Sequence, residues 1–137
     1  MANTGYEWSA WAFMQKGAAD WDADALADNA TETGDALSLS GKAGCIIGIA
    51  LAEDNTGAID GASTIFILGE TDLAYEETTI GSPYQFQITP VQNDTVHFQF
   101  PISPQYYDNF KIAVLNEGGQ ELAVTVKYKT ASIPVAS

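Results

Sequence analysis

Residues 110–129 read FKIAVLNEGGQELAVTVKYK, which is two alternating segments joined by a glycine-containing loop. Apolar side chains occupy every second position from Phe110 to Val114 and again from Leu122 to Tyr128. A period of two is that of a half-buried β-strand. A loop of about five residues between two such segments is typical of a hairpin. The stretch therefore predicts an antiparallel pair of strands.

The rest of the chain after Gly34 also consists of predicted strands and turns. Residues 84–88 and 96–100 alternate in the same way and predict a second hairpin. The other three predicted strands cover residues 35–40, 45–51 and 64–68. About seven strands separated by short turns predict an all-β chain, an antiparallel β-sandwich that is jelly-roll-like or immunoglobulin-like.

The first 32 residues lack this regular pattern. We predict that residues 1–32 form an N-terminal arm and that residues 33–137 form one β-sandwich domain, because 137 residues suffice for a single ordinary domain. Residues 18–30, rich in Ala and Asp, are the longest helix-like segment, although no apolar stripe runs along them.

Two predicted strands, 45–51 and 64–68, are apolar on both faces. A strand of a sandwich normally has one face in water, so its side chains alternate. Monomers rarely leave large apolar patches open. We therefore expect the outer face of these strands to be covered, either by the aromatic N-terminal arm or by another subunit.

The charge is one-sided and excludes some partners. Five Lys and no Arg face 18 acidic residues, for a net charge of −13, and 14 of the acids lie in residues 1–79. Nucleic acid is a poor partner for such a chain, because phosphate binding needs a Lys- or Arg-rich surface. An anionic membrane is disfavoured for the same reason, and the aromatic stretch near the N-terminus is too short to span a bilayer.

Candidate catalytic residues are scarce. His97 is the only histidine and lies on the polar face of a predicted strand, with no nucleophile motif beside it. Cys45 is the only cysteine, so no intrachain disulfide can form, and it lies in an apolar strand where a thiol behaves as a small hydrophobe. We predict no catalytic residue, no enzyme activity and no cofactor. We expect synthesis in a reducing cytoplasm.

The sequence does not predict a metal site, although three of its aspartates have a suggestive spacing. Asp20, Asp22 and Asp24 are spaced like the first ligands of a calcium loop. The sixth position is then Ala25 where an EF-hand has Gly, and the twelfth is Thr31 where it has Glu. An acidic loop in solvent accounts for the spacing better.

Three tryptophans in the first 21 residues, Trp8, Trp11 and Trp21, raise a carbohydrate hypothesis. Flat indole faces stack well on the apolar faces of sugars. The favoured alternative is that these rings cover the outer face of the sheet.

Several runs of the sequence resemble small virion structural proteins of tailed bacteriophages. The similarity extends over most of residues 33–130, and its main segments are 40–45, 53–61, 64–69, 108–116 and 124–130. The resemblance implies a non-enzymatic head decoration (cement) protein. Such proteins sit on the outer surface of the capsid, commonly as trimers, and clamp subunits of the major capsid protein. The expected location is thus the virion, after synthesis in the host cytoplasm.

We predict that contacts with the major capsid protein or between copies involve Trp8, Trp11, Phe13, Ile65 and Ile67. A homo-oligomer, favoured as a trimer, is expected from the surplus apolar surface. The sequence leaves two alternative functions open. One is a tail- or fibre-associated structural protein, and the other is a carbohydrate-binding or adhesion β-sandwich.

Overall fold

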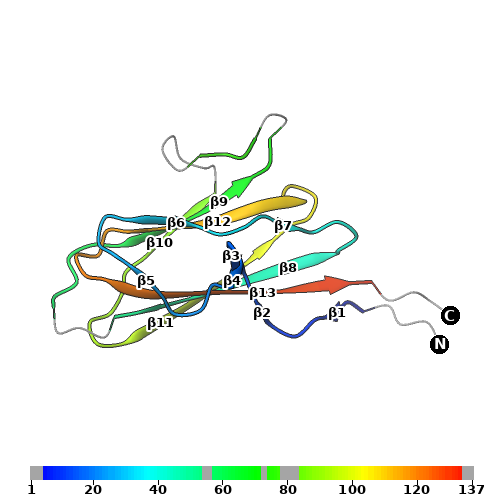
Figure 1. The fold of residues 1–137 in the computed structure, drawn as a ribbon. Helices are drawn as coiled ribbons and strands as arrows, with labels where there is room; N and C mark the ends of the chain where they lie inside the picture. Colours follow the sequence, from blue (N-terminus) through cyan, green and yellow to red (C-terminus); the bar gives the residue numbers. More distant parts are fainter. Residues whose placement is uncertain (1–4, 54–56, 72–73, 78–83, 134–137) are drawn as a thin grey trace.

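The computed structural model describes residues 5–53, 57–71, 74–77 and 84–133, and the regular elements in these ranges are all strands. Two antiparallel sheets pack face to face as a β-sandwich (Figure 1). The predicted all-β fold is confirmed. No helix of the described residues is long and apolar enough to cross a membrane.

The larger sheet has six strands in the order β1-β13-β8-β11, with β2 and β5 also pairing with β13. Its long strands are β8 (Gly44–Ala52), β11 (Thr95–Ile102) and β13 (Leu122–Ser132). Its short strands lie along one edge of β13 and are β1 (Glu7–Trp8), β2 (Ala12–Phe13) and β5 (Asp24–Leu26).

The second sheet has five strands in the order β10-β9-β12-β6, with β7 also pairing with β12. Its strands are β6 (Thr31–Thr33), β7 (Leu37–Ser38), β9 (Ser63–Gly69), β10 (Gln85–Ile88) and β12 (Asn109–Asn116). A separate two-stranded ribbon pairs β3 (Gln15–Lys16) with β4 (Ala19–Asp20).

The core lies between the two sheets and is filled by every second residue of the long strands. The six-stranded sheet contributes Cys45, Ile47, Ile49, Leu51, Val124 and Val126, and the five-stranded sheet contributes Ile65, Ile67, Phe110, Ile112 and Val114. Trp21 and Met14, from the N-terminal segment, are buried in the same cluster. Side chains of two inner faces that interdigitate in this way are what stabilises a sandwich.

Both predicted hairpins are wrong. β12 pairs with β9 in the five-stranded sheet, whereas β13 pairs with β8 in the six-stranded one. Likewise, β10 pairs with β9, and β11 pairs with β8. The connections at residues 117–121 and 89–94 therefore cross from one sheet to the other. Alternation reports only which face of a strand is buried, and both sheets bury one face against the same core, so alternation does not identify the partner strand.

The helix-like segment 18–30 is also not a helix. It contains β4 and β5, separated by a turn in which Ala23 has a φ of 51°. Asp is a weak helix former, and the edge of β13 offers unpaired backbone groups that β5 satisfies. Leu26 and Trp21 gain burial in the core by this arrangement.

The N-terminal segment extends both sheets. β1, β2 and β5 add to the edge of β13, and β6 adds to β12. The predicted boundary between residues 32 and 33 falls inside β6.

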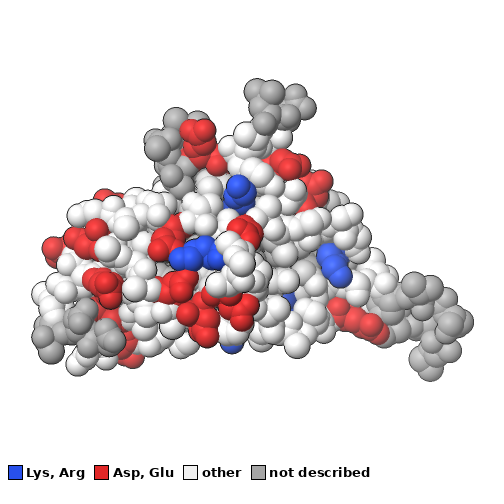
Figure 2. Space-filling view, in the orientation of Figure 1, with Lys and Arg blue, Asp and Glu red and all other residues white. Residues whose placement is uncertain are grey.

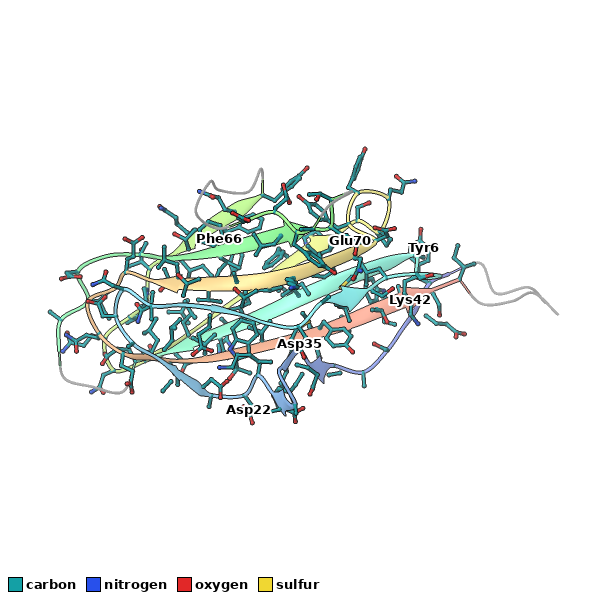
Figure 3. The ribbon with its side chains drawn as sticks, turned by 45° about the horizontal axis from the view of Figure 1, so that its top comes forward. Tyr6, Asp22, Asp35, Lys42, Phe66 and Glu70 are labelled. Carbon is teal, nitrogen blue, oxygen red and sulfur yellow. The ribbon has the colours of Figure 1, made fainter. Side chains whose placement is uncertain are left out.

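The outer face of β9 carries a second, small apolar cluster. Phe66 and Leu68 are buried there beside Ala113 of β12, with Leu115 half-buried against them. The segment after β9 folds back near this face: the Gly69 N–H donates to the Glu76 carboxylate at 2.8 Å, and the Lys111 ammonium lies 4.4 Å from the Tyr75 ring centroid. Figure 3 marks Phe66 on β9 and Glu70 at the start of that segment.

Asn116, at the end of β12, connects the crossover loop to the N-terminal segment. Its buried amide nitrogen donates to the carbonyls of Leu26 at 3.0 Å and Gln120 at 2.7 Å. Its side-chain oxygen accepts from the Gly118 N–H at 2.9 Å. Three hydrogen bonds of one buried side chain thus hold three segments together.

We predict that Asn116→Ala lowers the free energy of unfolding by about 2–4 kcal/mol, because it leaves buried backbone groups without partners. Urea unfolding followed by circular dichroism measures this change. The matched control is Asn109→Ala, which removes one exposed hydrogen bond to Glu70 and should cost less than about 0.5 kcal/mol. Equal effects of the two substitutions would contradict the role assigned to Asn116.

Candidate functional site: a groove on the six-stranded sheet

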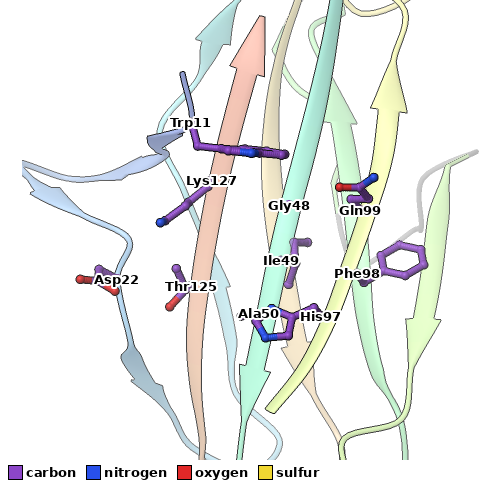
Figure 4. Close-up of a pocket in the computed structure, with 10 residues that line it drawn as sticks. All are labelled: Trp11, Asp22, Gly48, Ile49, Ala50, His97, Phe98, Gln99, Thr125 and Lys127. Atoms are coloured by element: carbon purple, nitrogen blue, oxygen red, sulfur yellow. The ribbon is translucent and has the colours of Figure 1, made fainter. Parts of the chain in front are cut away.

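A groove runs over the outer face of the six-stranded sheet. The central strand β8 presents only small side chains there, Gly48 and Ala50, and so forms a low floor. The register places Ala50 between His97 of β11 and Thr125 of β13, and it places Gly48 between Gln99 and Lys127. These four larger side chains form the walls of a hollow of about 690 Å³ (Figure 4).

Trp11 closes one end of this groove. A methyl group added to Gly48 would lie 3.3 Å from Cζ3 and 3.4 Å from Cη2 of the indole. Any residue larger than glycine at position 48 would therefore push the indole away from the sheet. Figure 4 shows the ring edge-on and lying across the strands above Gly48. Trp11 is 42% exposed, and its indole presents one face along the groove toward Ala50.

Two lysines of β13 hold the aromatic segment, residues 6–13, on the sheet. The Lys129 ammonium lies 5.3 Å from the ring centroid of Trp8 and 5.0 Å from that of Trp11, and the Lys127 ammonium lies 4.6 Å from that of Phe13. Backbone hydrogen bonds add to these cation–π contacts, since the Ser9 N–H donates to the Thr130 carbonyl at 2.8 Å. The chain's own arm thus covers part of the outer face of strand 45–51, at Gly44 and Gly48. The outer face of strand 64–68 is approached by the segment after β9 and not by the arm.

The predicted contact residues divide into two groups. Trp8, Trp11 and Phe13 come together on the outer face of the six-stranded sheet, as just described. Ile65 and Ile67, in contrast, are 0% and 2% exposed and lie in the core between the sheets. They cannot touch a partner, and assigning them to an interface is wrong. The apolar residues of β9 that point outward are Phe66 and Leu68.

The acidic turn 20–24 is engaged in contacts within the chain. The Gln15 amide donates to Asp20 at 2.6 Å, and the Lys16 ammonium pairs with Asp24 at 2.7 Å and also with Glu32. Burial by itself would lower the pKa of Lys16, but the hydrogen bonds to Asp24 and Glu32 raise this pKa above its ordinary value. The described residues hold no group of three or more His, Cys, Asp or Glu side chains suited to a metal ion.

The two most reactive side-chain types lie on opposite faces of the sheet. His97 stands on the groove wall, whereas Cys45 points into the core. Burial raises the pKa of the Cys45 thiol to about 12, so the side chain is a neutral thiol at physiological pH. The geometry therefore offers a binding surface with polar walls and an aromatic end. The sequence already indicated that the wall residues lie on the polar faces of their strands, but it did not show that they lie next to one another.

Similarity to known proteins is found among solved structures. A scan against protein-family models and a search of curated proteins both give no match. Among solved structures, the chain is similar to the coat protein of Tobacco streak virus, determined as a dimer. The sequence identity is 13%, the alignment covers 95% of this chain and 88% of that chain, and the TM-score is 0.34.

We predict that Lys129→Met loosens the aromatic segment without unfolding the sandwich. Two cation–π contacts of about 0.5–1 kcal/mol each are lost, so hydrogen exchange of the Ser9 amide should become about 5–30 times faster. Native-state exchange followed by NMR measures this rate.

Lys111→Met is the control for this experiment, because Lys111 contacts Tyr75 on the other sheet. It should leave exchange of the Ser9 amide unchanged. An unchanged Ser9 rate in Lys129→Met itself would show that the lysine does not hold the segment.

Proposed function

We propose that this protein is a non-enzymatic structural component of a virus particle. More specifically, it is a head decoration (cement) protein of the tailed-bacteriophage kind. Such a protein binds the outer surface of the shell of major capsid protein. The resemblance of most of residues 33–130 to small virion structural proteins supports it. The observation that carries it is an exposed apolar patch at one end of the sandwich.

This terminal patch consists of Tyr6, Trp8 and Ile133. Glu7 pairs with Ser132 and Trp8 pairs with Ala131, so the three apolar side chains come from two adjacent strand ends. Tyr6 is 61% exposed, Trp8 43% and Ile133 64%. Figure 1 places β1 and the end of β13 side by side at one end of the molecule. Contiguous exposed apolar surface on a soluble domain marks a site of contact with another protein.

The charge distribution supports an outer position on a particle. Acidic side chains outnumber lysines over the face drawn in Figure 2. Lys127 and Lys129 lie against aromatic rings, and Lys16 lies in ion pairs with two carboxylates. Little cationic surface is left to neutralise phosphates, which packaged DNA would require.

A non-enzymatic role is supported by the placement of the reactive groups. The neutral Cys45 thiol lies inside the core and His97 lies outside it, so the two cannot act together. A decoration protein needs no reaction, since it stabilises a shell by burying surface across subunit boundaries. A specific contact of this kind buries about 1,200–2,000 Å² in total, and repetition over the shell strengthens weak individual contacts.

We predict that the protein in solution has a mass three times that of the 14.6-kDa chain, and that the terminal patch forms the contact between copies. The double substitution Trp8→Ala, Ile133→Ser should reduce the mass to that of one chain. Light scattering after gel filtration measures both masses. The control, Val91→Ser, removes an equally exposed apolar side chain from the loop at the opposite end of the sheet and should leave the trimer intact. A wild-type monomer would refute the trimer.

The position on the particle is tested by immunogold electron microscopy with antibodies against the purified protein. Intact particles from the source that makes this chain should carry gold over the head surface. Gold confined to the tail or fibres would replace decoration by a tail-associated structural role. Intact and disrupted particles that both remain unlabelled would refute the virion role altogether.

A further inference from the structure

We propose that the groove on the six-stranded sheet binds a neutral saccharide. This binding activity goes beyond the proposed structural role, and it uses a different surface from the terminal patch.

Trp11 supplies a rigid, flat surface of the kind on which a sugar ring stacks. Its ring edge contacts Gly48, and the Lys129 ammonium lies 5.0 Å from its centroid. Lys129 is one outward position farther from Ala50 than Lys127 is, so it occupies the side of the ring away from the groove. The other ring face looks along the floor over Ala50. An indole held on one side and free on the other favours the C–H face of a pyranose.

The polar side chains stand on both sides of that face. Gln99 and His97 rise from β11 on one side, and Thr125 and Asp22 lie on the other. The Thr125 hydroxyl already accepts a hydrogen bond from the Ala23 N–H at 2.9 Å, which leaves its own hydrogen to donate. Amide, imidazole, hydroxyl and carboxylate groups around an aromatic face match the alternating donors and acceptors of sugar hydroxyl groups.

The balance of charge in the groove favours a neutral ligand. Asp22 is the acidic residue of the lining and Lys127 the basic one. The Lys127 ammonium lies 4.6 Å from the Phe13 ring, so it is already directed toward an aromatic partner. A carboxylated or phosphorylated ligand would find one lysine and no arginine among the lining residues, and the molecule as a whole, at −13, would repel it.

The dimensions fit one or two sugar units. The walls stand on β11 and β13, which are separated by β8. Neighbouring strands lie about 4.8 Å apart, so the two walls are separated by two such spacings. The hollow of about 690 Å³ lies within the range of small-molecule sites. The floor stays low because β8 presents Gly48 and Ala50 outward. A larger side chain at either position would fill the space in which the sugar would lie.

Titration of the ¹⁵N-labelled protein with sugars, followed by NMR, tests this proposal. The probes are the methyl glycosides of glucose, galactose, mannose and N-acetylglucosamine, each added to roughly 50 mM, because a dissociation constant of about 1–10 mM is expected for a single sugar unit. At least one probe should shift the amides of Gly48, Ala50 and Gln99 and the indole N–H of Trp11. Absence of shifts with all four probes, or shifts confined to residues elsewhere, would overturn the proposal.

Three variants test the residue assignment with the probe that binds best. Trp11→Ala should weaken binding at least about 10-fold, which corresponds to about 1.4 kcal/mol, and Trp11→Phe should restore most of the affinity because a flat ring returns. Tyr106→Ala, which removes an exposed aromatic ring that does not line the groove, should change the affinity less than about 2-fold. Undiminished binding by Trp11→Ala would refute the site.

Two further measurements test the charge of the ligand and the folding of the variants. The methyl glycoside of sialic acid, tested in the same way, should bind more weakly than the neutral probe, and tighter binding would overturn the assignment to a neutral ligand. The core amide shifts of each variant report whether the sandwich is still folded. Loss of sugar binding in Trp11→Ala leaves the particle labelling unaffected, so failure here and failure of the virion role are distinguishable.

Discussion

The register between β8 and β13 is the constraint on which the other features depend. It places Gly48 opposite Lys127 and Ala50 opposite Thr125, and on the other side of the same strands it places Ile49 and Val126 in the core. Side chains alternate across a sheet, so a slip of one residue would move every core side chain to the solvent face. The burial of the core therefore also determines which side chains line the groove.

The outer face of this sheet combines small residues with two of the few lysines of the chain. Gly48 lets the Trp11 indole approach the backbone of β8, and Lys129 lies against both Trp11 and Trp8. The aromatic segment is thus attached by a few backbone hydrogen bonds and by individually weak cation–π contacts. In a chain with only five lysines, two of them serve this attachment.

The two proposed binding surfaces lie on the same sheet but have different chemistry. The terminal patch is apolar, well exposed and formed by adjacent strand ends, which suits a contact with another folded protein. The groove has polar walls and one aromatic end, and suits a small hydroxyl-rich ligand. Both surfaces follow from the N-terminal segment, because β1 carries Trp8 and the segment between β1 and β2 carries Trp11.

The sequence alone determined the β class, the positions of the long strands and the buried face of each alternating strand, because these properties depend on a local period of two. The tertiary structure decided the strand partners. Residues 110–114 and 122–128 alternate as a hairpin would, yet they belong to opposite sheets, since both sheets bury a face against one core. It also decided that Ile65 and Ile67 point inward, because a strand that is apolar on both faces carries no periodic signal of which face is the core. The groove needs His97, Ala50 and Thr125 in one row, and only long-range backbone hydrogen bonding places residues so far apart in the chain side by side.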